Sequence, residues 1–149
     1  MNPSEPLANP VPLLDTAGIA DLLRRARRIA VVGASSNPTR PSHDVFATLV
    51  RAGYECIPVN PNETEVLGVP AVATLADAAA KGHIDIVDVF RRPEQTEPVA
   101  RETVAIGAGA LWLQIGVINW ETARIAAEGG LAVVMDRCPA NELRRMPRG

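Results

Sequence analysis

The sequence predicts a three-layer α/β sandwich built on a mainly parallel five-stranded sheet. Short runs of Ala, Val, Ile and Leu alternate along the chain with segments of helical periodicity, an order typical of right-handed β–α–β units. Hydrophobic residues make up 47% of the 149 residues, but aromatic residues only 3%. Such an aliphatic composition suits parallel strands that are covered by helices on both faces.

The expected elements begin after a proline-rich leader, residues 1–14, and residues 15–149 are expected to form a single domain. Asp15 is a candidate N-cap for a first helix whose apolar positions recur at helical spacing. A buried strand is expected at 29–32. A loop rich in turn-forming residues follows at 33–42.

The alternation continues to the end of the chain. A helix at 44–51 should end before Gly53, a residue typical of the position after a helix. The strand at 55–59 contains Pro58, which cannot donate a hydrogen bond to a neighbouring strand. We therefore expect Pro58 to lie near the end of the strand, or the strand to lie at an edge of the sheet there. The remaining expected elements are a helix at 75–80 with Thr74 as N-cap, a strand at 84–90, a helix at 93–106, a strand at 110–114, a helix at 120–128 and a strand at 131–135.

A ligand site is expected where these strands end. Open α/β sheets bind ligands outside the carboxyl ends of their strands. Each expected strand is followed by polar, glycine or proline residues, in the segments 33–42, 60–62, 90–92, 114–117 and 136–139.

The first of these segments has the composition of an anion-binding loop. Gly33 permits a tight turn, and a helix that starts near His43 would aim unpaired N–H groups at an anion. Ser35 and Ser42 add hydroxyl donors, and Arg40 adds a charge suited to phosphate. The alternative interpretation is an exposed loop in which Ser42 is an ordinary helix N-cap.

The dinucleotide fingerprint is incomplete in this chain. The pattern G-x-G-x-x-G falls on Gly33, Ser35 and Pro38, so two of its glycines are missing. The expected second strand ends at Asn60, where NAD-binding proteins place a carboxylate for the ribose hydroxyl. Both departures argue against a conventional NAD enzyme and leave NADP open.

Charge and hydropathy argue against several partners. The net charge of −2 gives no general attraction to nucleic acid or to an anionic membrane. No apolar stretch approaches the roughly 20 residues of a membrane span, and the start of the chain does not read as a signal peptide. Cys56 and Cys138 lack metal-ligand spacing and are expected as reduced thiols. A cytoplasmic protein is therefore expected.

Five segments together carry a family resemblance. They lie in order within residues 26–142, and they are 31–42 (VVGASSNPTRPS), 57–61 (IPVNP), 87–91 (VDVFR), 111–119 (LWLQIGVIN) and 134–139 (VMDRCP). The set resembles the small stand-alone CoA-binding proteins, a Rossmann-type family similar to the N-terminal CoA-binding domain of the succinyl-CoA synthetase alpha subunit.

The resemblance implies coenzyme A as the cofactor and assigns the site residues. The phosphates would lie on the loop, the ribose and its 3′-phosphate at the second strand, the adenine at the third and the pantetheine arm at the fourth. The residues so assigned are Gly33, Ala34, Ser35, Ser36, Arg40 and Ser42, then Val59, Asn60 and Pro61, then Phe90 and Arg91, and finally Gln114 to Gly116. The missing carboxylate agrees with this assignment, because a 3′-phosphate would be repelled by one at Asn60.

No catalytic set is identifiable. Asp85 and Asp88 fall on opposite faces of a strand, so they do not form an acid–base pair, and Asp88 is expected to hydrogen-bond a neighbouring loop. Cys138 is either a thiol that Arg137 activates or a small buried residue beneath the site. His43 is either a ligand contact or a helix residue. The synthetase carries its phosphohistidine in a second domain, so ligase activity does not carry over to this chain.

These observations favour a non-catalytic module that binds coenzyme A or an acyl-CoA, a small-molecule ligand. The alternatives are an NADP-linked oxidoreductase or an acyl-CoA transforming enzyme, and a pure interaction domain. A homodimer is left open, since Trp112 or Trp120 would suit a subunit contact.

Overall fold

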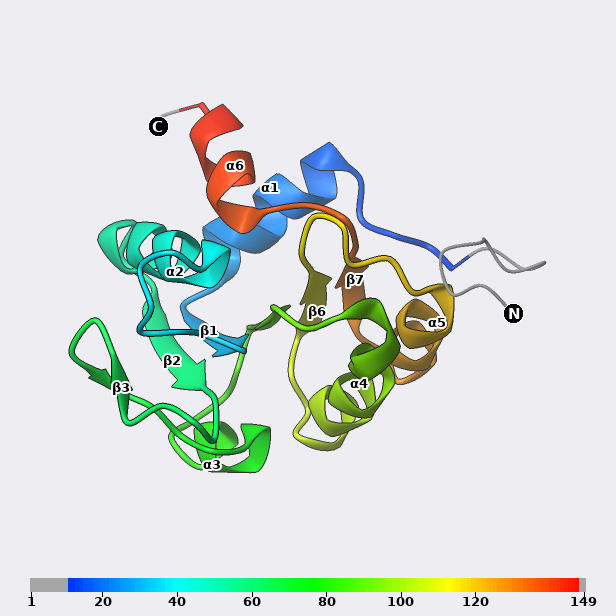
Figure 1. Cartoon of the computed structure of the whole chain (residues 1–149). Coiled ribbons are helices and arrows are strands. Elements are labelled where there is room, and N and C mark those ends of the chain that lie inside the picture. The colour runs from blue at the N-terminus through cyan, green and yellow to red at the C-terminus, as the bar shows by residue number, and fades with distance from the viewer. Residues whose placement is uncertain (1–10, 148–149) are drawn as a thin grey trace.

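The computed structural model describes residues 11–147, which form a five-stranded sheet between two layers of helices (Figure 1). All strand pairs in the sheet are parallel, which confirms the predicted architecture. Most of the proline-rich leader lies outside the described residues. The strands, in their order across the sheet, are β2 (Glu55–Val59), β1 (Arg28–Val32), β5 (Ile86–Val89), β6 (Ala110–Leu113) and β7 (Ala132–Val134).

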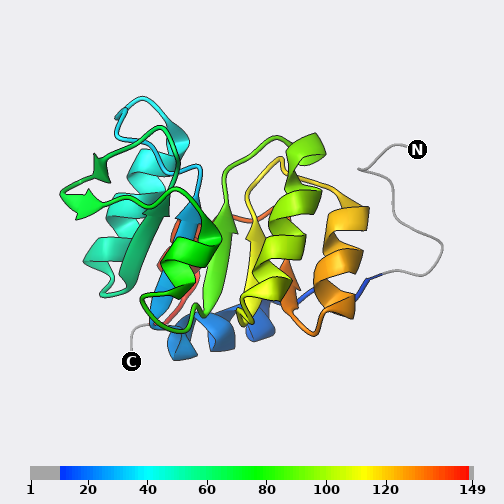
Figure 2. The ribbon, with the colours of Figure 1, turned by 90° about the horizontal axis from the view of Figure 1, so that it is seen from below.

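Three helices cover each face of the sheet. On one face lie α1 (Thr16–Arg25), α2 (Pro41–Arg51) and α6 (Pro139–Arg145). On the other lie α3 (Leu75–Ala79), α4 (Thr96–Ala105) and α5 (Trp120–Glu128), with the short 3₁₀ helix η1 (Pro93–Gln95) leading into α4. Figure 2 looks onto this second layer. No helix in the described part of the chain has the length and apolar character to cross a bilayer.

Alternation along the strands divides the core between the two faces. In β1, Ile29 and Val31 pack towards the α1–α2–α6 layer, whereas Ala30 and Val32 pack towards the α3–α4–α5 layer. Because β1 is buried on both faces from Ile29 to Val32, these four residues are all apolar, as the sequence pattern indicated. Trp112 is fully buried, so it belongs to the core and not to a subunit contact.

Several helix starts agree with the predicted caps. The Asp15 carboxylate accepts from the Gly18 N–H at 2.8 Å, and the Thr74 hydroxyl accepts from the Asp77 N–H at 3.1 Å. The second helix, expected at 44–51, begins three residues earlier because Pro41 suits the first helical position. Its N-cap is Arg40, so the alternative that made Ser42 the cap is wrong.

One edge of the sheet differs from a regular doubly wound fold. Where a further strand would pair with β2, Val72 alone forms a parallel bridge with Val59. The Val72 N–H donates to the Pro58 carbonyl and its own carbonyl accepts from the Asn60 N–H, both at 2.9 Å. Pro58 therefore lies in the edge strand of the five-stranded sheet, as predicted.

The sequence analysis missed two elements and predicted bounds for others that are too wide. A two-stranded hairpin, β3 (Glu65–Val66) and β4 (Val69–Pro70), precedes Val72, and α6 follows β7. The strand expected at 84–90 spans only β5, and the helix expected at 93–106 is divided into η1 and α4. At the carboxyl end of the sheet, β5, β6 and β7 each end one residue earlier than expected, which lengthens the loops that follow them.

Candidate functional site

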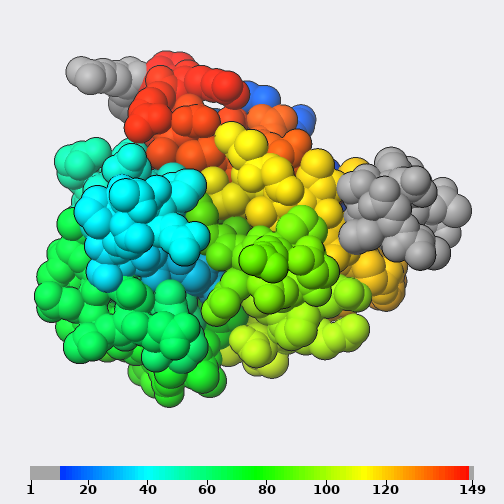
Figure 3. All heavy atoms as spheres, in the orientation of Figure 1, coloured from blue at the N-terminus to red at the C-terminus, as the bar shows by residue number. Residues whose placement is uncertain are grey.

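A cavity of about 790 Å³ lies at the carboxyl ends of β1, β2, β5 and β6, and the start of α6 contributes to its wall. The cyan, yellow and red segments that border it meet on the face shown in Figure 3. Its position matches the strand-end site that the sequence predicted. The lining residues are Gly33, Ser35, Arg40, Pro41, Ser42, Val45, Asn60, Phe90, Arg91, Arg92, Gln95, Gln114, Ile115, Val117, Cys138 and Asn141.

The charged residues of this cavity are all cationic. Arg40, Arg91 and Arg92 line it, and none of the described Asp or Glu residues does. None of the three guanidinium groups forms an ion pair with any residue in the range 11–147. In a chain of net charge −2, this local excess of unpaired positive charge makes the cavity suited to a polyanion.

The loop after β1 requires its glycine. Gly33 has a φ of 86°, and a Cβ atom there would overlap the carbonyl oxygen of Phe90. The Gly33 N–H donates to the Val59 carbonyl at 2.9 Å. The Ser36 N–H donates to the Glu63 carboxylate at 2.7 Å. Two of the four amides expected to approach phosphates are thus engaged within the protein, which leaves those of Ala34 and Ser35.

Side chains from outside the loop hold it in place. The Asn60 side-chain amide donates to the Ala34 carbonyl at 3.0 Å. His43 Nδ1 lies 3.0 Å from the Ser35 carbonyl oxygen, and since a carbonyl only accepts, Nδ1 carries the hydrogen. Asn60 and His43 therefore position the loop, a role that the sequence analysis did not predict for either residue.

A second cavity of about 510 Å³ adjoins the first and shares Arg91 and Gln95 with it. Val59 and Pro61 line this second cavity, together with Thr74 and other residues of the α3–α4 side. The two cavities therefore lie next to one another, with Arg91 and Gln95 in the wall of both.

The structure brings most of the predicted site residues together. Nine of them line the first cavity: Gly33, Ser35, Arg40, Ser42, Asn60, Phe90, Arg91, Gln114 and Ile115. Val59 and Pro61 line the second. Ala34 is fully buried, Ser36 faces a hollow beside the β3–β4 hairpin, and Gly116 lines neither cavity.

Several lining residues were not assigned to a part of the ligand. Arg92 and Cys138 fall within the strand-end segments 90–92 and 136–139, where the sequence predicted a ligand site. Gln95 and Asn141 lie outside those segments, and the sequence analysis missed them. Asn141 belongs to α6, a helix that was not expected.

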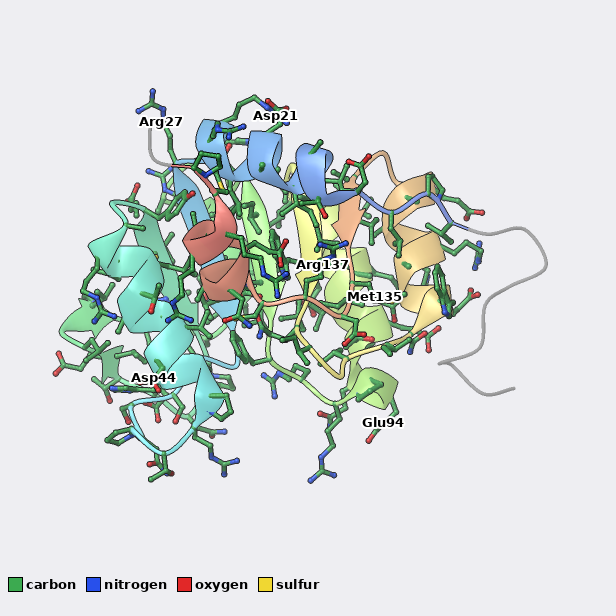
Figure 4. All side chains as sticks on the ribbon, turned by 90° about the horizontal axis from the view of Figure 1, so that it is seen from above. Asp21, Arg27, Asp44, Glu94, Met135 and Arg137 are labelled. Atoms are coloured by element: carbon green, nitrogen blue, oxygen red, sulfur yellow. The ribbon has the colours of Figure 1, made fainter. Side chains whose placement is uncertain are left out.

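The segment between β7 and α6 is tied to the loop after β6. Asp136, which has a φ of 60°, accepts from the Gly116 N–H at 2.7 Å. The Arg137 carbonyl accepts from the Trp112 indole N–H at 2.7 Å. The Arg137 side chain, labelled in Figure 4, reaches Glu142 of α6 at 3.1 Å. The charge expected to activate Cys138 is therefore paired with a carboxylate.

Two polar groups beside this region lack partners. Gln114 is 8% exposed, and its Oε1 has no hydrogen-bond partner among the described residues. Asp88 is fully buried, and both of its carboxylate oxygens lack partners there, so its expected bond to a loop is wrong. Burial raises the pKa of Asp88 well above its usual range. Within 11–147, no group of three or more potential metal ligands is present.

The comparisons with known proteins agree with this geometry. Residues 27–144 match the family described as CoA binding domain. The uncharacterized protein YneT of Bacillus subtilis is 48% identical over 122 residues, which cover 82% of this chain and 89% of YneT.

Two solved structures are similar over most of the chain. A protein of Thermus thermophilus is 38% identical, with a TM-score of 0.82, over 89% of this chain and 98% of its own. A hypothetical protein of Pyrococcus horikoshii is 33% identical, with a TM-score of 0.84, over 97% of this chain and 98% of its own. By its sequence, its fold and the extent of these matches, the chain belongs to the CoA-binding domain family.

Proposed function

We propose that this protein binds coenzyme A or an acyl-CoA at the carboxyl ends of its parallel strands, as a non-catalytic binding module formed by residues 15–149. The observation that carries the proposal is a set of three arginines, Arg40, Arg91 and Arg92, around a cavity. Within residues 11–147, none of them forms an ion pair and no carboxylate lines the cavity. Coenzyme A presents a diphosphate and a 3′-phosphate, and guanidinium groups match such groups in both charge and geometry.

The two adjoining cavities support an assignment of the ligand's parts. The diphosphate would lie on the loop after β1, beside Arg40. The adenosine would enter the second cavity at Val59 and Pro61, which Arg91 connects to the first. The pantetheine arm would then cross the end of β6 at Gln114.

Other observations support the remaining parts of the proposal. The described residues present neither a metal-ligand cluster nor a paired acid and base at the cavity, which favours binding without catalysis. Both cysteines are free and buried, as expected of a protein in the reducing cytoplasm.

Thermal unfolding with a panel of nucleotides tests the proposal. We expect coenzyme A at about 1 mM to stabilise the protein, by about 2.7 kcal/mol if that is 100 times the dissociation constant. Dephospho-CoA should stabilise it less, because it lacks the 3′-phosphate. Arg40→Gln and Arg91→Gln should reduce the shift, whereas Arg51→Gln, at an exposed position of α2, should not.

The same panel distinguishes the alternatives. Stabilisation by NADP but not by coenzyme A would overturn the proposal in favour of an oxidoreductase. Stabilisation by neither would favour an interaction domain. Acetyl-CoA recovered intact after incubation is expected of a module that only binds, and its hydrolysis would identify an acyl-CoA transforming enzyme.

A further inference from the structure

The cavity wall includes both the loop after β1 and the start of α6. Arg40 lines the cavity from the loop, and Cys138 lines it from the N-cap position of α6. The Arg137 N–H donates to the Leu113 carbonyl at 3.4 Å, so the chain crosses the carboxyl end of β6 immediately before Cys138, and α6 then packs against α2. Gln114, the residue after β6, lines the same cavity. A ligand that begins at the loop after β1 and contacts Gln114 therefore occupies the cavity that Cys138 lines.

Cys138 is a free thiol with access from this cavity. It is 7% exposed and lines the cavity wall. Cys56, in contrast, has no access from either cavity, because it lies inside β2 and lines neither of them. Burial, and then the nearby Asp88 carboxyl, raise the pKa of Cys56 to about 12. The chain thus offers one thiol at the site and one matched thiol in the core.

Gln114 provides independent evidence that a ligand passes this point. More than nine-tenths of this residue is buried at the cavity wall, yet its Oε1 has no partner among residues 11–147. A buried amide oxygen without a donor is costly in a folded protein. The pantetheine arm carries two amide groups, and a donor from one of them would satisfy Gln114 on the way to Cys138.

We propose that Cys138 exchanges with the disulfide of oxidised coenzyme A and captures the coenzyme covalently. This inference rests on the proposed function, because noncovalent binding delivers the disulfide to the thiol. Cys138 loses its proton to solvent, and its thiolate attacks the coenzyme A sulfur of a CoA–S–S–R disulfide. The Cys138–CoA disulfide forms, the CoA–S–S–R bond breaks, and the R–S⁻ leaving group takes up a proton. The incoming disulfide supplies the oxidising equivalents.

The test is the intact mass of the full chain after incubation with coenzyme A disulfide without reductant. We expect the mass to rise by one coenzyme A less two hydrogens, because each of the two thiols loses one, with the adduct mapped to Cys138 by peptide analysis and reversed by dithiothreitol. Cys56→Ser should retain the adduct, and Cys138→Ser should lose it. Glutathione disulfide at the same concentration should react at a rate at least about tenfold lower, because it lacks the nucleotide that raises the effective concentration at the thiol.

Binding of coenzyme A to Cys138→Ser, measured by calorimetry, separates this inference from the proposed function. If that variant binds coenzyme A but the wild type forms no adduct, the inference is overturned and the proposed function stands. Equal reaction with glutathione disulfide also overturns it, because Cys138 would then be an unselective thiol. If neither protein binds coenzyme A, both proposals fail. Cys138→Ala replaces the serine variant if the latter does not fold.

Discussion

Asp88 is a carboxylic acid in a strand that is otherwise apolar. The sheet register places it between Val31 of β1 and Trp112 of β6, within the core beneath α1, α2 and α6. Its oxygens have no partner in the described part of the chain. Without a hydrogen bond or a counter-charge, the buried group is held in its neutral form, which is why its pKa is raised.

The raised pKa predicts how stability depends on pH. Above about pH 4 the unfolded chain releases the Asp88 proton while the folded chain keeps it. The free energy of unfolding should therefore fall as pH rises towards the folded-state pKa, by up to about 1.4 kcal/mol per pH unit. Asp88→Asn should remove this slope in urea unfolding between pH 5 and 8. Asp44→Asn, at an exposed carboxylate of α2, should keep it. Parallel profiles for wild type and Asp88→Asn would contradict the explanation.

The β3–β4 hairpin and the loop after β1 are joined by one charged contact. Glu63, just before the hairpin, accepts from the Ser36 N–H at 2.7 Å, and its own N–H donates to the Asn60 carbonyl at 3.2 Å. The Glu63 carboxylate therefore occupies a donor of the loop that we assign to the ligand's phosphates. A carboxylate at this place orders the loop, but it also opposes the arrival of another anion.

Removing that charge should strengthen binding. Glu63→Gln keeps an oxygen that can accept from the Ser36 N–H but removes the repulsion of phosphate. We expect the dissociation constant for coenzyme A, measured by calorimetry, to fall about two- to fivefold, as expected for a partly exposed charge pair. Glu65→Gln is the matched control, since this exposed residue of β3 forms no hydrogen bond or ion pair with the described residues of the loop. Weaker binding by Glu63→Gln would show that the carboxylate acts mainly by ordering the loop.

The molecule as a whole separates its charge. The chain has a net charge of −2, yet one end of its sheet presents three arginines without carboxylate partners among residues 11–147. Ion pairs of the other arginines lie elsewhere, for example between Arg28 and Glu55 at 2.6 Å. The cavity can thus attract an anionic ligand although the protein as a whole does not.

This charge separation predicts a salt-dependent affinity. Because the Debye length shortens from about 10 Å at 0.1 M to about 3 Å at 1 M salt, the dissociation constant for coenzyme A should rise roughly tenfold over that range. Arg40→Gln should bind more weakly and with a smaller salt dependence. An affinity that does not change with salt would mean that apolar contacts, and not the arginines, hold the ligand.

The architecture was predictable because it depends on local patterns. Aliphatic strands, helix caps at Asp15 and Thr74, and the proline in the edge strand all leave marks within a few residues. The β3–β4 hairpin was not predicted because its turn holds Leu67 at a φ of 50°, a conformation that glycine or asparagine usually adopts. Helix α6 was not predicted because its seven residues include a single large apolar side chain, Leu143, which gives no helical periodicity to detect.

The site was predictable only in part, for the same reason. Arg40 and Arg91 were found because each follows a strand closely. The contacts of Glu63 with Ser36 and of Asp136 with Gly116 join segments 27 and 20 residues apart. Such contacts depend on how the elements pack, and no spacing in the sequence encodes them. Cys138 was recognised as a thiol of interest, but its place at the cavity wall follows from the unexpected helix.

The hydrogen bond between the Trp112 indole and the Arg137 carbonyl gives the protein its own optical reporter. Indole emission responds to hydrogen bonding and to the polarity around the ring, and Trp112 lies in a dry core directly beside the segment that carries Cys138. Trp120 lies in the other layer and packs against the opposite side of the core. A ligand that moves the 136–139 segment should therefore shift the emission wavelength of Trp112, so that binding can be followed by intrinsic fluorescence without an attached dye.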